Sequence, residues 1–193
     1  EGLDNIDEII EASDGIMLAR GDLGVEIDAK RIPQLQKEII QKCNYHGKLV
    51  ITATQMLDSM IRNPRPTRAE VTDVANAVYD GTDAVMLSGE SANGKYPVEA
   101  AKTMASIVEY TEQFLDYKQF KTRMVEKTVY ESIGNAVCAA SVTTASELKA
   151  SAIVASTLSG ITASMISKYR PITPIYALSP SQIVTRQMML FWG

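Results

Sequence analysis

The sequence has few of the features that would place a protein at a membrane, on nucleic acid or in an oxidising compartment. Its two cysteines, Cys43 and Cys138, lie far apart, and neither sits in a CxxC motif or a Cys/His cluster. The single histidine, His46, is expected in a solvent-exposed turn between a helix and a strand. Basic residues are outnumbered, with 19 Lys and Arg against 23 Asp and Glu, a formal net charge of −4. No apolar run approaches the roughly 20 residues of a membrane-spanning helix. We therefore expect a cytoplasmic protein with buried, reduced thiols, whose partners include neither nucleic acid nor membrane.

The residues that are present suit a water-soluble globular fold. Hydrophobic residues make up 46% of the 193 residues and charged residues 22%, which is ordinary for such proteins. The first residue is Glu1 and not Met, so we expect the chain to begin inside a longer protein. Short apolar runs alternate with stretches of helical periodicity, and this alternation predicts a parallel α/β architecture.

The first half of the chain repeats a strand followed by a helix three times. Strands are expected at residues 16–19, 49–53 and 84–87, and the helices that follow them at 32–46, 68–80 and 97–115. Each strand is almost continuously apolar, as in sheets covered on both faces, which leaves a doubly wound sheet or a (β/α) barrel. The phrase "SDGIMLARGDLGVEI" at residues 13–27 is echoed by "DGTDAVMLSGES" at 80–91, which favours a barrel built from similar units.

The second half reads as part of another domain. The charged segment 116–127, "DYKQFKTRMVEK", loses the periodicity and is interpreted as a connector. A helix from about 129 to 148, a strand at 152–156, a helix at 161–169, a strand at 175–178 and a last helix opened by Ser179-Pro180 then form one βαβ unit. The predicted domains are therefore 1–115, the connector 116–127, and 128–193.

Small and polar residues follow all three strands of the first half. In α/β folds ligands bind at the carboxyl ends of the strands, and here these ends carry Arg20-Gly21-Asp22, Thr54, and the segment 88–91. Gly21 lacks a Cβ and lets backbone N–H groups approach an anionic ligand, while Asp22 beside it suits a bridging Mg²⁺. The structural alternatives are a helix cap for Asp22 and a hydroxyl bonded to local backbone for Thr54.

Two further segments could take part in binding. The turn "TLSG" at residues 157–160, followed by Thr162 at a helix start, could cradle a phosphate, although the turn contains no Lys or Arg. The loop in which Arg62, Arg65 and Arg68 flank prolines is either a solvated loop or a surface that docks between subunits.

Three long motifs carry a resemblance to a known family. "SDGIMLARGDLGVEI", "VITATQMLDSMIRNPRPTRAEVTDVANAVYDGTDAVMLSGESANGKYPVEA" and "SKYRP" closely resemble the pyruvate kinase family in its bacterial form. The resemblance covers essentially the whole chain. It implies the last three strand-helix units of a (β/α)₈ TIM barrel, followed by part of a three-layer α/β C-terminal regulatory domain.

The resemblance also implies a function and site residues. The family transfers a phosphoryl group from phosphoenolpyruvate to ADP in glycolysis, giving pyruvate and ATP, and relies on Mg²⁺ and K⁺. Asp22 resembles the Mg²⁺ ligand that touches the substrate, and the backbone N–H groups of Gly21 and Asp22 resemble the donors to the substrate carboxylate. Thr54 resembles the catalytic hydroxyl near the reacting enol. Arg20 resembles the arginine at the strand end that has a supporting role. Arg68 lies in the segment that resembles a subunit interface of a homotetramer. The allosteric effector loop corresponds to Thr157, Ser159, Gly160 and Thr162.

Departures from the family pattern shape the remaining expectations. The lysine that stabilises the enolate, the second Mg²⁺ carboxylate and the K⁺ ligands would precede Glu1, so the isolated chain is expected to be inactive. Leu158 and Ile161 stand where relatives regulated by sugar bisphosphates often carry basic residues. Two alternatives stay open. One is a non-catalytic module for phosphosugar binding or assembly that uses residues 157–162. The other is a metal-dependent aldolase-type barrel, but aldolase chemistry has no evident use for the segment "ITATQML…RPTRAEV".

Overall fold

The computed structural model describes residues 2–127 and 132–193, and the chain divides into two units. Unit 1 consists of Glu1–Cys43 and Val50–Leu115, and unit 2 of Asn44–Leu49 and Asp116–Gly193. Among the described residues, no helix combines the length and the apolar character that crossing a bilayer requires.

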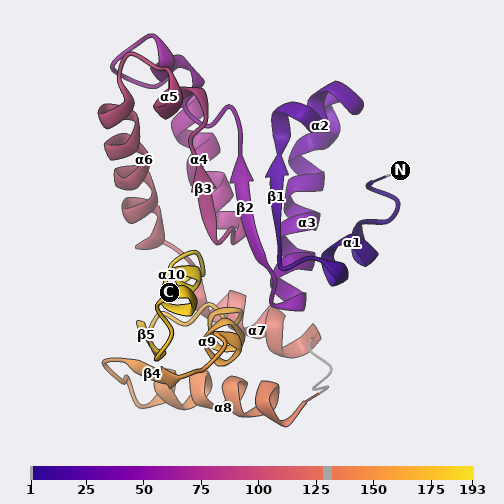
Figure 1. Ribbon diagram of the computed structural model, residues 1–193, viewed down its shortest axis with the longest axis vertical. Coiled ribbons are helices and arrows are strands. Elements are labelled where there is room, and N and C mark those ends of the chain that lie inside the picture. Colours follow the sequence, from indigo (N-terminus) through magenta and orange to yellow (C-terminus); the bar gives the residue numbers. More distant parts are fainter. Residues whose placement is uncertain (1, 128–131) are drawn as a thin grey trace. The chain divides into compact units, whose positions relative to one another are not determined.

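Unit 1 is organised around an open, three-stranded sheet. The strands are β1 (Gly15–Ala19), β2 (Leu49–Ala53) and β3 (Ala84–Met86), in the order β1-β2-β3. β2 and β3 are parallel, with Ala53 opposite Met86, and the arrows of β1 and β2 point to the same side in Figure 1. The predicted strands are thereby confirmed. Because all three run in one direction, their carboxyl ends lie along a single edge of the sheet.

Helices connect and cover these strands. They are α1 (Ile6–Ala12), α2 (Arg20–Glu26), α3 (Ile32–His46), α4 (Arg68–Asp80), α5 (Gly89–Ala92) and α6 (Pro97–Glu112), with the 3₁₀ turns η1 (Ala29–Arg31) and η2 (Asp58–Ile61). α4 begins with the expected capping box, in which Thr67 and Glu70 each bond the other's backbone, and it ends at Gly81 in the left-handed conformation. α4 and α6 lie side by side in Figure 1.

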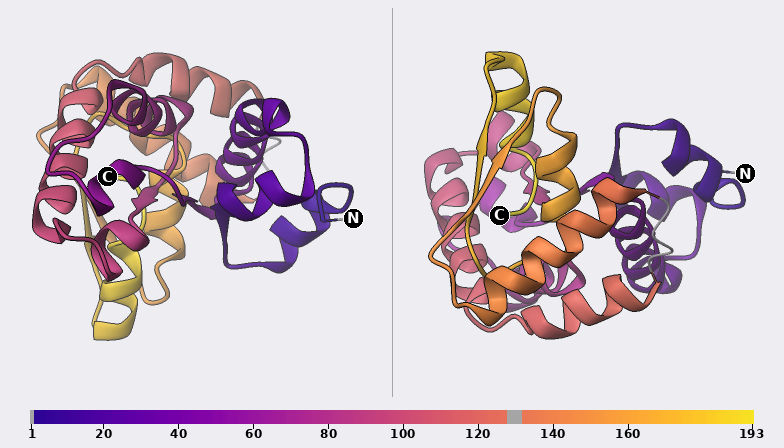
Figure 2. Two further views of the ribbon diagram at one scale, coloured as in Figure 1. Left: turned by 90° about the horizontal axis from the view of Figure 1, so that it is seen from above. Right: turned by 90° about the horizontal axis from the view of Figure 1, so that it is seen from below.

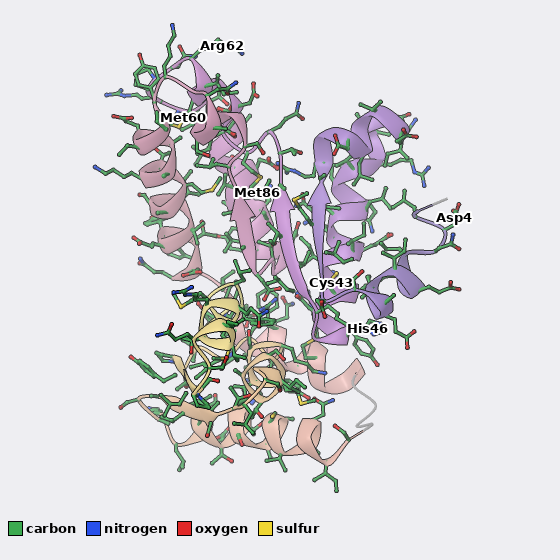
Figure 3. The ribbon with its side chains drawn as sticks, viewed as in Figure 1. Asp4, Cys43, His46, Met60, Arg62 and Met86 are labelled. Carbon is green, nitrogen blue, oxygen red and sulfur yellow. The ribbon has the colours of Figure 1, made fainter. Side chains whose placement is uncertain are left out.

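Two apolar clusters hold unit 1 together. One packs α1 and α3 against β1 and β2, and it includes Cys43, which has no exposed surface and is labelled on α3 in Figure 3. The other packs Val74 and Ala77 of α4 against Ala100 and Met104 of α6, together with Met56, Leu57 and Met60 from the segment after β2. That segment is therefore anchored by burial as well as by the polar contacts described below.

Unit 2 contains a parallel two-stranded sheet, β4 (Ile153–Ser156) and β5 (Ile175–Leu178), with Ile153 opposite Ile175. Its helices are α7 (Tyr117–Lys127), α8 (Ile133–Glu147), α9 (Ile161–Ser167) and α10 (Gln182–Met188). α8 and α9 contact one another, as Figure 2 shows, and both help to cover the sheet. Both cysteines are free and buried, as expected.

Three segments of the second half differ in detail from the sequence interpretation. The segment 116–127 is largely helical, because it contains neither Gly nor Pro and is rich in residues with good helix propensity, and its role as a connector stays a prediction. The last helix is capped by Ser181, whose hydroxyl accepts the Val184 N–H, and not opened by Ser179-Pro180. The long helix begins at Ile133 after the capping Ser132, while residues 128–131 of its predicted start lie outside the described residues.

Candidate active site

The carboxyl edge of the sheet in unit 1 brings together residues from three separate parts of the sequence. β1 runs directly into Arg20, Gly21 and Asp22 at the start of α2, β2 ends one residue before Thr54, and β3 is followed by the turn that leads to Glu90 in α5. In Figure 1 these segments lie near α2 and α5, at the ends of the arrows. The strand ends therefore gather the predicted residues at one edge, as the parallel architecture requires.

Gly21 and Thr54 are in direct contact. The Gly21 N–H donates a hydrogen bond of 2.7 Å to the Thr54 hydroxyl, although the two residues are 33 positions apart. The amide is available because it lies in the first turn of α2, where an N–H has no acceptor within the helix. A Cβ on Gly21 would lie 3.3 Å from the same hydroxyl oxygen. The glycine therefore admits the Thr54 side chain, a role that the sequence had assigned only to ligand approach.

The backbone of Thr54 is unusual. Its φ angle is 68° and that of Gln55 is 55°, so two successive residues with side chains occupy the left-handed region. A β-branched residue rarely adopts this conformation, and such backbone strain costs about 1–3 kcal/mol per residue. The surrounding contacts must over-determine this conformation. The sequence contains no Gly or Asn there that would have revealed it.

Arg20 is the most extensively bonded side chain of this edge, with only 9% of its surface exposed. Its Nη2 donates to the Thr54 carbonyl at 2.9 Å and to the Met56 sulfur at 2.8 Å. Its Nη1 donates to Asp73 at 2.6 Å and to Gln36 at 3.2 Å. Nε is buried without a hydrogen-bond partner. The guanidinium thus holds the loop after β2 from the side of β1, while Asp73 on α4 balances its charge.

Glu90 faces the same loop from the side of β3. It is 2% exposed, and its two carboxylate oxygens accept the Leu57 N–H at 3.0 Å and the Ser88 N–H at 2.8 Å. The sequence placed Glu90 at a polar strand end without giving it a role. Asp73 was missed entirely, because on α4 it is one polar residue among several on that helix.

Asp22 lies next to Gly21 in the first turn of α2, and its side chain is exposed. The N-cap of α2 is Ala19, so the alternative interpretation of Asp22 as a helix cap is wrong. No group of three or more His, Cys, Asp or Glu side chains in the described part of the chain could enclose a metal ion. Asp22 can therefore contribute one carboxylate to a cation, but the described residues do not form a complete site around it.

Two cavities flank this region and share no lining residue. One of about 520 Å³ is lined by polar groups that include Arg20, Gln55 and Asp73. The other, of about 710 Å³, is bordered by Asp22 and by mainly apolar residues of α1, β1 and α2. Neither cavity is lined by both Asp22 and Thr54. The assignment of a candidate active site therefore depends on the residues at the strand ends and not on a closed pocket.

The loop between β2 and α4 is fixed by Glu70. This carboxylate accepts hydrogen bonds from the backbone and hydroxyl of Ser59 and of Thr67, at 2.6–2.9 Å. Burial raises the pKa of Glu70, but these hydrogen bonds outweigh it and hold the pKa below its usual value. Arg68, the first residue of α4, is exposed, and so is Arg62, which Figure 3 labels at the far end of the loop.

In unit 2, the turn predicted as a phosphate cradle is shaped by its own side chain. The Thr157 hydroxyl is buried and accepts the Gly160 N–H at 2.9 Å, and Gly160 has a left-handed φ of 89°. Ser159 and Thr162 are exposed. Only these last two hydroxyls face solvent, where a ligand could reach them.

Comparisons with known proteins agree with these observations. The family profile "Pyruvate kinase, barrel domain" matches residues 1–101, and "Pyruvate kinase, alpha/beta domain" matches residues 135–193. The chain is 56% identical to pyruvate kinases of Clostridium acetobutylicum and Geobacillus stearothermophilus, with 100% of this chain and 41% and 33% of those proteins covered. A crystal structure of a pyruvate kinase from Cryptosporidium parvum superposes with a TM-score of 0.96 at 46% identity, covering 100% of this chain and 39% of that one.

The expected fold class is confirmed by these matches, since a barrel domain and an alpha/beta domain follow one another in the predicted order. The chain spans between a third and two fifths of the length of these relatives. Together, the strand-end geometry, the two domain matches and the 56% identity over the full length of this chain show that the chain belongs to the pyruvate kinase family.

Proposed function

We propose that this chain forms one wall of the active site of a pyruvate kinase, which transfers a phosphoryl group from phosphoenolpyruvate to ADP and yields pyruvate and ATP. The contact that carries the proposal is the 2.7 Å hydrogen bond between the Gly21 N–H and the Thr54 hydroxyl. It joins residues of two separate family motifs at the edge where barrel enzymes bind their substrates.

The proposed roles follow from the donors and acceptors at this edge. The Asp22 amide, in the first turn of α2, would donate to the carboxylate of the substrate, whereas the Gly21 amide already donates to the Thr54 hydroxyl and would have to exchange that bond for one to the carboxylate. The Thr54 hydroxyl accepts the Gly21 N–H, so its own hydrogen stays available for donation to the substrate. An accepted hydrogen bond polarises a hydroxyl and strengthens it as a donor, which suits a group that helps to protonate the enolate carbon.

Asp22 is the residue of this chain that would hold Mg²⁺. Its exposed carboxylate at a strand end is the hard oxygen donor that this ion prefers, and Mg²⁺ commonly uses only one or two protein carboxylates. Bound Mg²⁺ would supply positive charge beside the phosphoryl and enol oxygens. No residue of this chain is assigned to K⁺. The chain's own contribution is to orient the substrate carboxylate and to hold a proton on the Thr54 oxygen.

Other parts of the proposal concern assembly and regulation. The exposed Arg68 and the rigid loop before it fit a contact between subunits of a homotetramer. Ser159 and Thr162 in the turn after β4 would face an allosteric effector, while Thr157 and Gly160 would shape the turn. A non-catalytic module that uses only this turn is the alternative, but the family match of the barrel segment favours the enzyme.

A chimera tests the proposal directly. The 193 residues would replace the aligned segment of the Clostridium acetobutylicum relative, and turnover would be measured with phosphoenolpyruvate, ADP and Mg²⁺. We expect activity within about tenfold of the parent, because all of this chain aligns at 56% identity. Asp22→Asn in the chimera should abolish most of it, and the 193-residue chain alone should show none. A folded chimera without turnover, or an active Asp22→Asn variant, would refute the proposal.

A further inference from the structure

Two buried charged side chains meet the same short loop from opposite sides. The loop after β2, residues 54–57 (the β2 loop), receives Arg20 from the end of β1 and Glu90 from the end of β3. The arginine is 9% exposed and the glutamate 2% exposed. Both have polar partners inside unit 1, and neither is a helix cap or part of a surface ion pair. Such a pair requires an explanation, because buried charges are costly unless each is specifically bonded.

Arg20 holds the first part of the β2 loop. Its Nη2 donates to the Thr54 carbonyl at 2.9 Å and contacts the Met56 sulfur at 2.8 Å, while Nη1 is fixed by Asp73 at 2.6 Å. The guanidinium is a rigid planar fork, so fixing one arm on α4 also fixes the other arm on the loop. The orientation of the Thr54 carbonyl is therefore set by a helix that lies outside the loop.

Glu90 holds the last part of the β2 loop. One oxygen accepts the Leu57 N–H, and the other accepts the Ser88 N–H, so the carboxylate ties the loop to the end of β3. The carboxylate therefore connects the amide of Leu57 to that of Ser88, the N-cap of α5.

The residues with left-handed backbone lie at and just after the first anchor. Thr54, with φ 68°, itself carries the carbonyl that Arg20 binds, and Gln55, with φ 55°, lies between that carbonyl and the amide that Glu90 binds. Without the anchors a β-branched residue would return to the extended region that it prefers. That change would rotate the Thr54 side chain away from the Gly21 amide.

We propose that Arg20 and Glu90 are a pair of positioning residues that hold the β2 loop in its left-handed conformation and so place the Thr54 hydroxyl for the reaction. The role in the reaction rests on the proposed function, whereas the control of the loop conformation does not. Neither side chain touches the substrate in this arrangement. Arg20 acts through the Thr54 carbonyl, and Glu90 acts through the Leu57 amide.

Conservative substitutions in the chimera test the pair. Arg20→Lys keeps the positive charge but loses the planar guanidinium that bonds Asp73 and the Thr54 carbonyl at once. Glu90→Gln keeps the shape of the side chain but replaces one carboxylate oxygen with an NH₂ group, which would face the N–H of Leu57 or Ser88. The matched control is Glu70→Gln, which makes the same chemical change at a hydrogen-bonded carboxylate that contacts Ser59 and Thr67 instead of the β2 loop. We expect kcat to fall about 10- to 100-fold in both test variants, because a displacement of about 1 Å has effects of this size. The KM for phosphoenolpyruvate should change less than about threefold, and the control should keep its kcat.

Crystal structures of the same variants supply the second measurement. The proposal requires that Thr54 leaves the left-handed region, or that the Gly21 N–H no longer reaches its hydroxyl, in Arg20→Lys and Glu90→Gln but not in Glu70→Gln. Unchanged kcat, or reduced kcat with Thr54 in its original place, would overturn it. A large rise in KM with kcat retained would instead make Arg20 a direct substrate ligand. If the unsubstituted chimera folds but lacks turnover, the proposed function fails, while the position of Thr54 in the variants still decides whether the pair controls the loop.

Discussion

Thr54→Val is the substitution that most directly tests the chemistry of the strand-end edge. Valine has the shape and the β-branching of threonine, so the strain of the left-handed backbone is retained and only the hydroxyl is lost. The Gly21 N–H then has no acceptor in place of a 2.7 Å hydrogen bond. An unsatisfied, partly buried donor costs about 1–3 kcal/mol, and because Gly21 is only partly buried we expect about 1–2 kcal/mol.

Hydrogen exchange of the Gly21 amide measures this cost locally. A loss of about 1–2 kcal/mol corresponds to roughly 5- to 30-fold faster exchange, which NMR or mass spectrometry of the segment 13–27 can resolve. Thr54→Ser is the matched control, since it keeps the oxygen and should leave exchange within about threefold of the original rate.

Turnover of the chimera completes the test of Thr54. A proton donor to the substrate contributes about 10²- to 10⁴-fold, so Thr54→Val should lower kcat by that factor, and Thr54→Ser should keep most of it. If the Gly21 amide of Thr54→Val exchanges as slowly as in the original protein, the reasoning about the hydrogen bond is refuted. If exchange accelerates but kcat is unchanged, the hydroxyl is structural and has no part in the chemistry.

Three further outcomes are expected. Burial raises the pKa of Cys43 to about 12, so at pH 8 only about one molecule in 10⁴ carries the thiolate. This thiol should therefore react with a disulfide reagent far more slowly in the folded protein than in urea, and equal rates would contradict its burial. The lowered pKa of Glu70 stabilises the folded state at pH values above 4.5, the ordinary pKa of a Glu side chain. The free energy of unfolding in urea should therefore exceed that of Glu70→Gln by its full amount at pH 7, and this difference should shrink as the pH falls below 4.5. A difference that does not change with pH would exclude this linkage. Gly94→Ala should lower the midpoint of thermal unfolding, because the new Cβ would lie 2.4 Å from the Glu90 carbonyl oxygen. Gly2→Ala, whose Cβ would have no atom within 4 Å, should leave the midpoint unchanged, and equal midpoints for the two variants would show that the α5 turn tolerates the clash.

Much of unit 1 could be predicted because its signals are local. The strand 49–53 is an apolar run bounded by turns, α4 is announced by Thr67 and Glu70 in capping positions, and Gly81 marks its end. The placement of Gly21 at the carboxyl edge of the sheet follows from strand direction alone. Local rules also explain why the helix Tyr117–Lys127 was not predicted, since a high density of charge was given more weight than the absence of helix-breaking residues.

The conformation of the β2 loop could not be predicted, because nothing in its own sequence favours it. Thr54 and Gln55 are poor candidates for left-handed backbone, and the groups that hold them there lie about 34 residues away in the sequence. Arg20 was singled out because of its position after a strand, but its partners on α3 and α4 depend on how those helices pack. Tertiary contacts here override the local preference of the chain.

The two anchors of the β2 loop also bear on the order in which unit 1 folds. The bond from Arg20 to the Thr54 carbonyl spans 34 residues and the bond from Leu57 to Glu90 spans 33, so each closes one complete strand-helix repeat. Closing such loops costs conformational entropy, and this cost is recovered only when the neighbouring strands have paired. The strained backbone at Thr54 therefore has no support until β1, β2 and β3 are all in place. We expect the Leu57 amide to gain protection late in a pulse-labelling refolding experiment, after the amides within α3 and α4, so that the strand-end edge forms only on a sheet that is already assembled.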